Sequence, residues 1–110
     1  MTHSELVRAI QLECSQGDVR LFINNTGQWQ DGVGNWIRYG LCVGSSDLIG
    51  WRTIFRIAQF VALEVKTGKG RLTKEQMSFG EQVERMGGVF ACVRSVDDAK
   101  RALGLDCQQA

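Results

Sequence analysis

Residues 60–79, FVALEVKTGKGRLTKEQMSF, contain the transitions that decide the fold: an apolar run, a glycine-rich turn and the start of a helix. The apolar run, which begins at about Ile54 and ends at Val65, predicts a strand because it is rich in β-branched and aromatic residues. It nevertheless carries Glu64, and Lys66 follows it directly. Burying an unpaired charge costs several kcal/mol, so these two side chains are expected either to lie at the surface or to have a function.

The composition predicts one globular domain. The chain has 110 residues, of which 44% are hydrophobic and 23% are charged. No apolar run approaches the roughly 18 residues that a membrane span needs, and the first ten residues are too polar for a signal peptide, so we expect a cytoplasmic protein without a membrane partner. None of the cysteines forms a C-x-x-C pair, which indicates reduced thiols and neither a zinc site nor a disulfide framework; they are Cys14, Cys42, Cys92 and Cys107.

The charge pattern and the single histidine restrict the possible chemistry. A net charge of +1 gives no general attraction to nucleic acid, but Lys66, Lys69, Arg71 and Lys74 are crowded into one segment, where an anion would meet them. The glycines of this segment do not form a P-loop motif, so no nucleotide cofactor is expected. His3 is the only histidine and lies beside the first residue, which argues against histidine acid–base catalysis and multi-histidine metal sites. Carboxylates and lysine are left as the reactive groups.

Capping and periodicity patterns predict a mixed α/β fold. Thr2–Glu5 and Thr73–Gln76 are capping boxes, and Ser95 is a third N-cap. The expected helices run to about Cys14, to Gly87–Gly88 and to about Leu103, with strands over 19–23, 47–51, 54–65 and 89–93 and a long mobile loop with five glycines over 24–46. The order helix, three strands, helix, strand, helix corresponds to a mixed sheet flanked by helices. The inward-facing residues of the first two helices are expected to be Leu6, Ala9, Ile10 and Leu12, and Met77, Gly80 and Val83.

Strand register predicts a cluster of charged side chains. An antiparallel hairpin that turns at Phe55 and Arg56 places Asp47 directly opposite Glu64, on one face. Lys66 is two residues from Glu64 and therefore points to the same side. Two carboxylates about 4 to 5 Å apart repel each other unless a cation lies between them, and oxygen ligands of this kind suit Mg²⁺ or Mn²⁺. A neighbouring lysine can stabilise the negative charge that develops on a phosphate during hydrolysis.

Simpler interpretations of these residues remain open on spacing alone. Asp47 and Lys66 are also placed to form a cross-strand ion pair worth under about 1 kcal/mol. Gln76 is fully explained by its capping box, and the basic residues after Lys66 are equally consistent with a solvated face.

Three segments together resemble the VRR-NUC family of the PD-(D/E)xK nuclease superfamily. They are SSDLIG (45–50), EVKTGKGRLTKEQMSF (64–79) and GGVFACVRS (87–95), and the resemblance spans nearly the whole chain. An E-x-K motif alone is weak, whereas its combination with the other two segments is specific. Ser46 stands where the superfamily motif has proline. The resemblance implies a restriction-endonuclease-like core and a metal-dependent nuclease.

The resemblance also implies roles for individual residues. Asp47 and Glu64 correspond to the ligands of Mg²⁺ or Mn²⁺, the backbone carbonyl of Val65 to a third ligand, and Lys66 to the catalytic lysine. Gln76 matches a glutamine of the family's helix. The acidic residue of the first helix, which in this family approaches the metal, corresponds to Glu5; a separation of nearly two turns from Leu12 also places Glu5 at the border of the apolar face.

Stand-alone proteins that this chain resembles occur in phages and bacteria and act on branched DNA, which implies a DNA endonuclease of repair or replication. We expect a homodimer that resolves Holliday junctions, because two symmetric nicks need two active sites. Interface candidates are the first helix and the long loop with its aromatic residues Trp29, Trp36 and Tyr39, although this loop is equally able to bind DNA through Arg38. Phosphate contacts are expected at Lys69, Arg71 and Lys74. The alternatives are a monomeric flap or splayed-end nuclease or nickase, a nonenzymatic DNA-binding module, and a scaffold subunit of a replication complex.

Overall fold

The computed structural model describes residues 1–105 of the chain, so the prediction for Cys107 lies outside the described residues. The elements follow the order α1 (His3–Cys14), β1 (Val19–Ile23), β2 (Gly27–Gln30), β3 (Trp36–Tyr39), β4 (Leu48–Ile54), β5 (Ile57–Val65), α2 (Lys74–Arg85), β6 (Val89–Val93) and α3 (Val96–Leu103). Four strands form a sheet in the order β1-β4-β5-β6, in which only β6 runs parallel to its neighbour, and β2 and β3 form a separate two-stranded sheet. The predicted mixed α/β architecture is confirmed.

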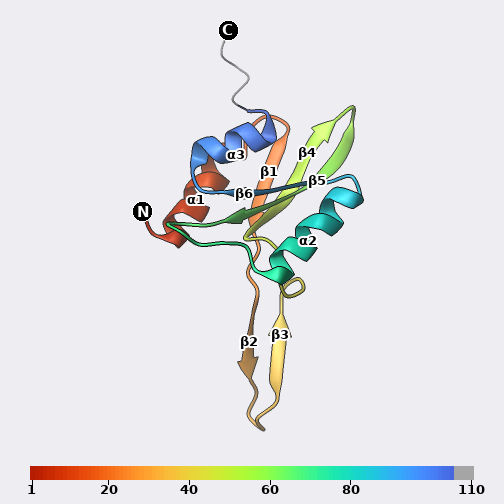
Figure 1. Cartoon of the computed structure of the whole chain (residues 1–110). Helices are drawn as coiled ribbons and strands as arrows, with labels where there is room; N and C mark the ends of the chain where they lie inside the picture. The colour runs from red at the N-terminus through yellow and green to blue at the C-terminus, as the bar shows by residue number, and fades with distance from the viewer. Residues whose placement is uncertain (106–110) are drawn as a thin grey trace.

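The helices cover the four-stranded sheet from two sides. Figure 1 shows α1 and α3 together against one face and α2 against the other. Residues 61, 63 and 65 of β5 point into the core under α1 and α3, where they meet the buried side chains of Ile10 and Leu103. Because side chains alternate along a strand, Glu64 points to the side of α2. Among residues 1–105, no helix is both long enough and apolar enough to cross a membrane.

The helix starts follow from their capping residues. The Thr2 and Thr73 side chains accept hydrogen bonds from the backbone N–H groups of Glu5 and Gln76, and both reciprocal capping-box bonds are present. Ser95 caps α3 in the same way by accepting from the N–H of Asp98. These caps were predicted from the sequence, and the three helices begin where they place them.

Two of the predicted inward-facing residues are exposed. Leu12 is 66% exposed, since it lies roughly 200° around the helix from both Ile10 and Cys14, the residues that α1 buries. Met77 is 45% exposed, because it lies about 120° around α2 from the buried Val83.

The hairpin of β4 and β5 has the predicted register. Leu48 pairs with Leu63 at its open end, and Ile54 pairs with Ile57 beside the turn. The turn residues Phe55 and Arg56 have φ angles of 50° and 66°, as a tight two-residue turn requires. Asp47 and Glu64 are therefore the next residues in register beyond the end of the ladder.

The predicted mobile loop over 24–46 is wrong for much of its length. Gly27–Gln30 pairs with Trp36–Tyr39 to form an antiparallel ribbon that projects from the body of the molecule (Figure 1). Asp31 closes the connection, because its side chain accepts hydrogen bonds from the backbone of Val33 and Asn35. The high glycine content concealed two short polar–aromatic runs on either side of a turn, which is a hairpin pattern.

Candidate functional site

The two acids lie where β4 begins and β5 ends. Asp47 immediately precedes β4, and its Oδ2 accepts a hydrogen bond of 2.8 Å from the backbone N–H of Val65. This bond fixes one carboxylate oxygen of Asp47 against the strand that carries Glu64. Burial is the main cause of the raised pKa of Glu64, and the negative charge of Asp47 contributes to it, as expected for two carboxylates that lie near each other.

Glu64 is a buried carboxylate with two polar partners. Only 3% of the residue is exposed, and Oε2 accepts a hydrogen bond of 3.0 Å from Nε2 of Gln76. The same oxygen lies 3.4 Å from Nζ of Lys66. Burial and, after it, the negative charge of Asp47 raise the pKa of Glu64 to about 7, although Lys66 opposes the shift. The site is therefore short of positive charge when both acids are ionised.

Gln76 contacts both the helix cap and the buried acid, and its catalytic role stays a prediction. Its Oε1 accepts from the backbone N–H of Thr73 at 2.9 Å and closes the capping box, while its Nε2 donates to Glu64. The amide has an acceptor at one end and a donor at the other, so one side chain serves both partners. The start of α2 thereby holds the Glu64 carboxylate in position.

His3 is the residue that sequence reasoning missed. The first turn of α1 brings its Nε2 within 3.0 Å of the carbonyl oxygen of Val65 and within 3.4 Å of Asp47 Oδ2. No local pattern reveals this contact, because it depends on how α1 packs against the end of the sheet. Its proximity to the first residue suggested that His3 takes no part in the site. The structure instead places the imidazole ring beside Asp47 and the Val65 carbonyl.

The side chain of Glu5 belongs to the capping box of α1. Its carboxylate accepts a hydrogen bond of 2.7 Å from the backbone N–H of Thr2, and this bond is the main cause of a lowered pKa. The exposure of Leu12 removes the argument that placed Glu5 at an apolar border. The structure does not bring Glu5 together with the two acids, and its role as a metal ligand stays a prediction.

The predicted DNA-binding residues lie on two separate parts of the molecule. Lys69, Arg71 and Lys74 are exposed in and after the turn that follows β5, whereas Arg38 is exposed on the β2–β3 ribbon. Arg94 braces that turn, because its guanidinium donates to the carbonyl oxygens of Gly68 at 3.1 Å and Gly70 at 2.6 Å.

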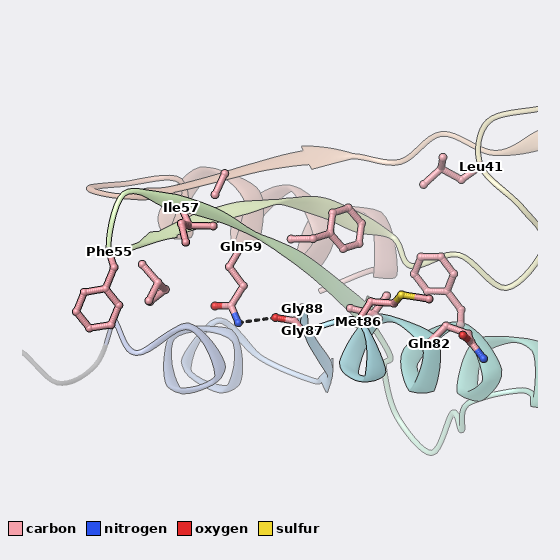
Figure 2. Close-up of a pocket in the computed structure, with 13 residues that line it drawn as sticks. Leu41, Phe55, Ile57, Gln59, Gln82, Met86, Gly87 and Gly88 are labelled. Atoms are coloured by element: carbon pink, nitrogen blue, oxygen red, sulfur yellow. Dashed lines mark hydrogen bonds between the residues drawn. The ribbon is translucent and has the colours of Figure 1, made fainter.

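A polar hollow of about 440 Å³ opens beside Asp47. Its lining joins the first turns of α1 to the segment after β1 and includes His3, Arg8, Asn24, Asn25 and Asp47. Sequence reasoning did not single out the guanidinium of Arg8 or the amides of Asn24 and Asn25 that line this hollow. A larger apolar cavity of about 770 Å³ lies between α2 and the far end of the β4–β5 hairpin (Figure 2), and neither acid lines it.

The donor atoms fit a divalent cation. Carboxylates from Asp47 and Glu64 and the Val65 carbonyl are hard oxygen ligands, and a cation would offset both the burial and the repulsion from Asp47 that raise the pKa of Glu64. Within residues 1–105, no three side chains of His, Cys, Asp or Glu are grouped closely enough to bind a metal by themselves. A site here would therefore need the backbone oxygen as well as the two acids.

The fold and the paired acids beside a lysine define a mixed α/β domain consistent with a restriction-endonuclease-like core. The family model of the VRR-NUC domain matches residues 7–97, and the chain belongs to this family. Members are nucleases of the PD-(D/E)xK type. The comparisons found no match among curated proteins and none among solved structures.

Proposed function

We propose that the whole chain, residues 1–110, is one metal-dependent DNA endonuclease domain with Asp47, Glu64 and Lys66 as its active site. The observation that carries the proposal is the buried Glu64, whose Oε2 lies 3.4 Å from Lys66 Nζ and whose pKa is raised in part by Asp47. A surface ion pair would not bury an acid in this way, and family membership gives the acids a reason to be adjacent.

Each residue has a distinct part in phosphodiester hydrolysis. Asp47, Glu64 and the Val65 carbonyl would hold Mg²⁺ or Mn²⁺, which when bound neutralises phosphate charge and makes a water molecule more acidic. Gln76 orients Glu64 through their hydrogen bond of 3.0 Å. Lys66, only 17% exposed at its side chain, stabilises the negative charge that develops on the phosphate. Lys69, Arg71 and Lys74 bind the DNA backbone beside the site.

A cleavage assay on linear and branched DNA tests this proposal. We expect cleavage with Mg²⁺ or Mn²⁺ and little with Ca²⁺, which is larger and coordinates more loosely. Asp47→Asn and Glu64→Gln should abolish cleavage without unfolding the protein, whereas the matched control Glu84→Gln changes an exposed acid of α2 and should leave it intact. Equal cleavage in a chelator, or unchanged rates in both variants, would contradict the proposal.

The preferred substrate is a four-way DNA junction cut by a homodimer. One chain provides one pair of acids and one nick, and junction resolution needs two symmetric nicks, which a twofold dimer supplies. The β2–β3 ribbon supports association or DNA binding, because Trp29, Trp36 and Tyr39 are 52%, 65% and 48% exposed and Arg38 lies among them. Large aromatic side chains on a projecting ribbon are typical of a contact surface.

Light scattering at micromolar concentration and mapping of nicks on an immobile junction decide this point. We expect twice the mass of one chain and paired nicks on opposing strands. A monomeric mass with single nicks at flaps or splayed ends would replace the resolvase with a monomeric nuclease. DNA binding with no cleavage under any metal would leave a binding module of the same fold.

A further inference from the structure

The inference concerns His3 and rests on the proposed function. His3 Nε2 lies 3.0 Å from Val65 O and 3.4 Å from Asp47 Oδ2, the carbonyl oxygen and one oxygen of the carboxylate that we assign to the metal. One nitrogen thus faces two oxygen donors from different parts of the chain. The side chain is 47% exposed, so it is open to solvent and is not part of the apolar core.

The spacing of these atoms matches that of neighbouring ligands around one cation. In an octahedral shell with metal–ligand distances of about 2.1 Å, adjacent ligands lie about 3.0 Å apart. The nitrogen is at this separation from Val65 O and slightly beyond it from Asp47 Oδ2. The second distance exceeds the usual N–H···O range of about 2.7 to 3.2 Å, so hydrogen bonding does not account for both contacts.

The helix holds His3 in this place independently of any ligand. His3 is the first residue of α1, and the capping box between Thr2 and Glu5 fixes the backbone on either side of it. Leu6, Val7 and Ile10 anchor the helix in the core. Such preorganisation of one side chain against two oxygen atoms is a requirement of a metal site.

We propose that His3 is a ligand of the divalent cation through Nε2, beside Asp47 and the Val65 carbonyl. Because no three His, Cys, Asp or Glu side chains of residues 1–105 are grouped closely enough to hold a metal by themselves, Glu64 moves toward these three groups when the cation binds. The neutral ring offers the lone pair of Nε2 when Nδ1 carries the proton. Mg²⁺ prefers oxygen ligands, whereas imidazole nitrogen is a good ligand for divalent transition-metal ions. The nitrogen ligand therefore shifts the preference of the site from Mg²⁺ toward Mn²⁺.

The single histidine makes this proposal directly testable by spectroscopy. His3 is the only histidine of the chain, so in protein without a histidine tag every imidazole signal comes from it. We expect pulsed electron paramagnetic resonance of bound Mn²⁺ to show coupling to an imidazole nitrogen. Histidine labelled with ¹⁵N in the ring should change that coupling, and His3→Gln should abolish it.

Calorimetry with Mn²⁺ and Mg²⁺ provides a second measurement. We expect His3→Gln to weaken Mn²⁺ binding about tenfold and Mg²⁺ binding by less than about twofold, since only the transition-metal ion depends on the nitrogen. The neighbouring exposed Ser4→Ala variant is the matched control and should change neither.

The outcomes separate this inference from the proposed function. Mn²⁺ binding that Asp47→Asn weakens, without nitrogen coupling and without a change in His3→Gln, would overturn the ligand role and leave His3 as a hydrogen-bond donor to Val65. Mn²⁺ binding that is indifferent to Asp47→Asn would instead overturn the metal centre itself, and the role of His3 with it.

Discussion

Gln76 links the cap of α2 to the buried acid: its Nε2 donates to Glu64 Oε2 at 3.0 Å, and its Oε1 accepts from the Thr73 backbone at 2.9 Å. The same amide therefore sets where the helix begins and how the carboxylate is oriented. A change in the helix start would move a group of the proposed active site.

The two roles of Gln76 can be separated by substitution. Gln76→Glu keeps an oxygen for the Thr73 N–H but replaces the donor to Glu64 with a second negative charge, whereas Gln76→Ala removes both contacts. We expect both variants to reduce single-turnover cleavage by at least about tenfold, and only Gln76→Ala to lose the reciprocal capping bond to the Thr73 N–H, which is worth about 1 kcal/mol. Urea unfolding at pH 4.5, where repulsion is weakest, measures the cap. Full activity of Gln76→Glu would leave Gln76 with the capping role alone.

Stability should depend on pH through Glu64. Its pKa is about 7 in the folded protein and near 4.5 in the unfolded chain, so the folded state binds this proton more tightly. The free energy of unfolding therefore falls as the pH rises from about 4.5 to about 7, and then levels off. Without divalent cations, we expect Glu64→Gln to gain roughly 3 kcal/mol relative to the natural protein between pH 4.5 and pH 8. Urea titrations at both pH values measure this difference.

The control for that prediction is again Glu84→Gln, an exposed acid whose substitution should give the same change at both pH values. Saturating Mn²⁺ should reduce the penalty at pH 8, because a cation bound between the acids favours their ionised form. If the free energy of unfolding of Glu64→Gln does not exceed that of the natural protein at pH 8, the ionised Glu64 carboxylate is already stabilised by its neighbours.

The helix caps were predictable from the sequence because each depends on a short local pattern, whereas the hairpin register followed from the spacing of two apolar runs. A turn at Phe55 and Arg56 gives a ladder that ends at Leu48 and Leu63, with Asp47 and Glu64 next in register. The capping boxes at Thr2 and Thr73 fixed two helix starts. Family motifs then supplied the chemical meaning of these positions.

The position of His3 was not predictable, because it depends on the packing of a whole helix against the end of a sheet. Hydrophobic spacing gave the buried face of α1 only approximately, since Ile10 was correct and Leu12 was wrong. His3 and Glu5 lie about 200° apart around the helix axis, so an approximate buried face does not decide which of them lies beside Asp47. The β2–β3 ribbon was missed for another reason: its glycines outweighed its short aromatic strands.

The turn between β4 and β5 stores backbone strain. Phe55 and Arg56 both have positive φ, a conformation that costs ordinary residues roughly 1 kcal/mol each and suits Asn-Gly. Phe55 is also 93% exposed at the rim of the apolar cavity (Figure 2). We expect Phe55→Asn with Arg56→Gly to raise the unfolding free energy by about 1 to 2 kcal/mol in urea titrations. A loss of stability would show that Phe55 contributes packing that outweighs the strain.

Substitution of Lys66 tests whether the proposed site stabilises the negative charge that develops on the phosphate. Its Nζ lies 3.4 Å from Glu64 Oε2, near enough to affect both the acid and a phosphate bound there. We expect Lys66→Ala to lower the single-turnover cleavage rate by about 10² to 10³-fold, which is typical for the loss of one group that stabilises developing negative charge. Mn²⁺ affinity measured by calorimetry should change little, because the lysine does not bind the cation.

Two further measurements decide whether that loss reflects catalysis. Lys66→Arg keeps the positive charge but changes its shape and reach, so it should restore only part of the rate. Affinity for DNA in Ca²⁺ reports phosphate binding without cleavage, and we expect Lys66→Ala to leave it within about threefold, since Lys69, Arg71 and Lys74 remain exposed beside the site. A Lys66→Ala variant that binds DNA poorly yet cleaves bound DNA at the normal rate would reassign Lys66 to substrate binding. Another group beside Glu64 would then have to stabilise the charge on the phosphate.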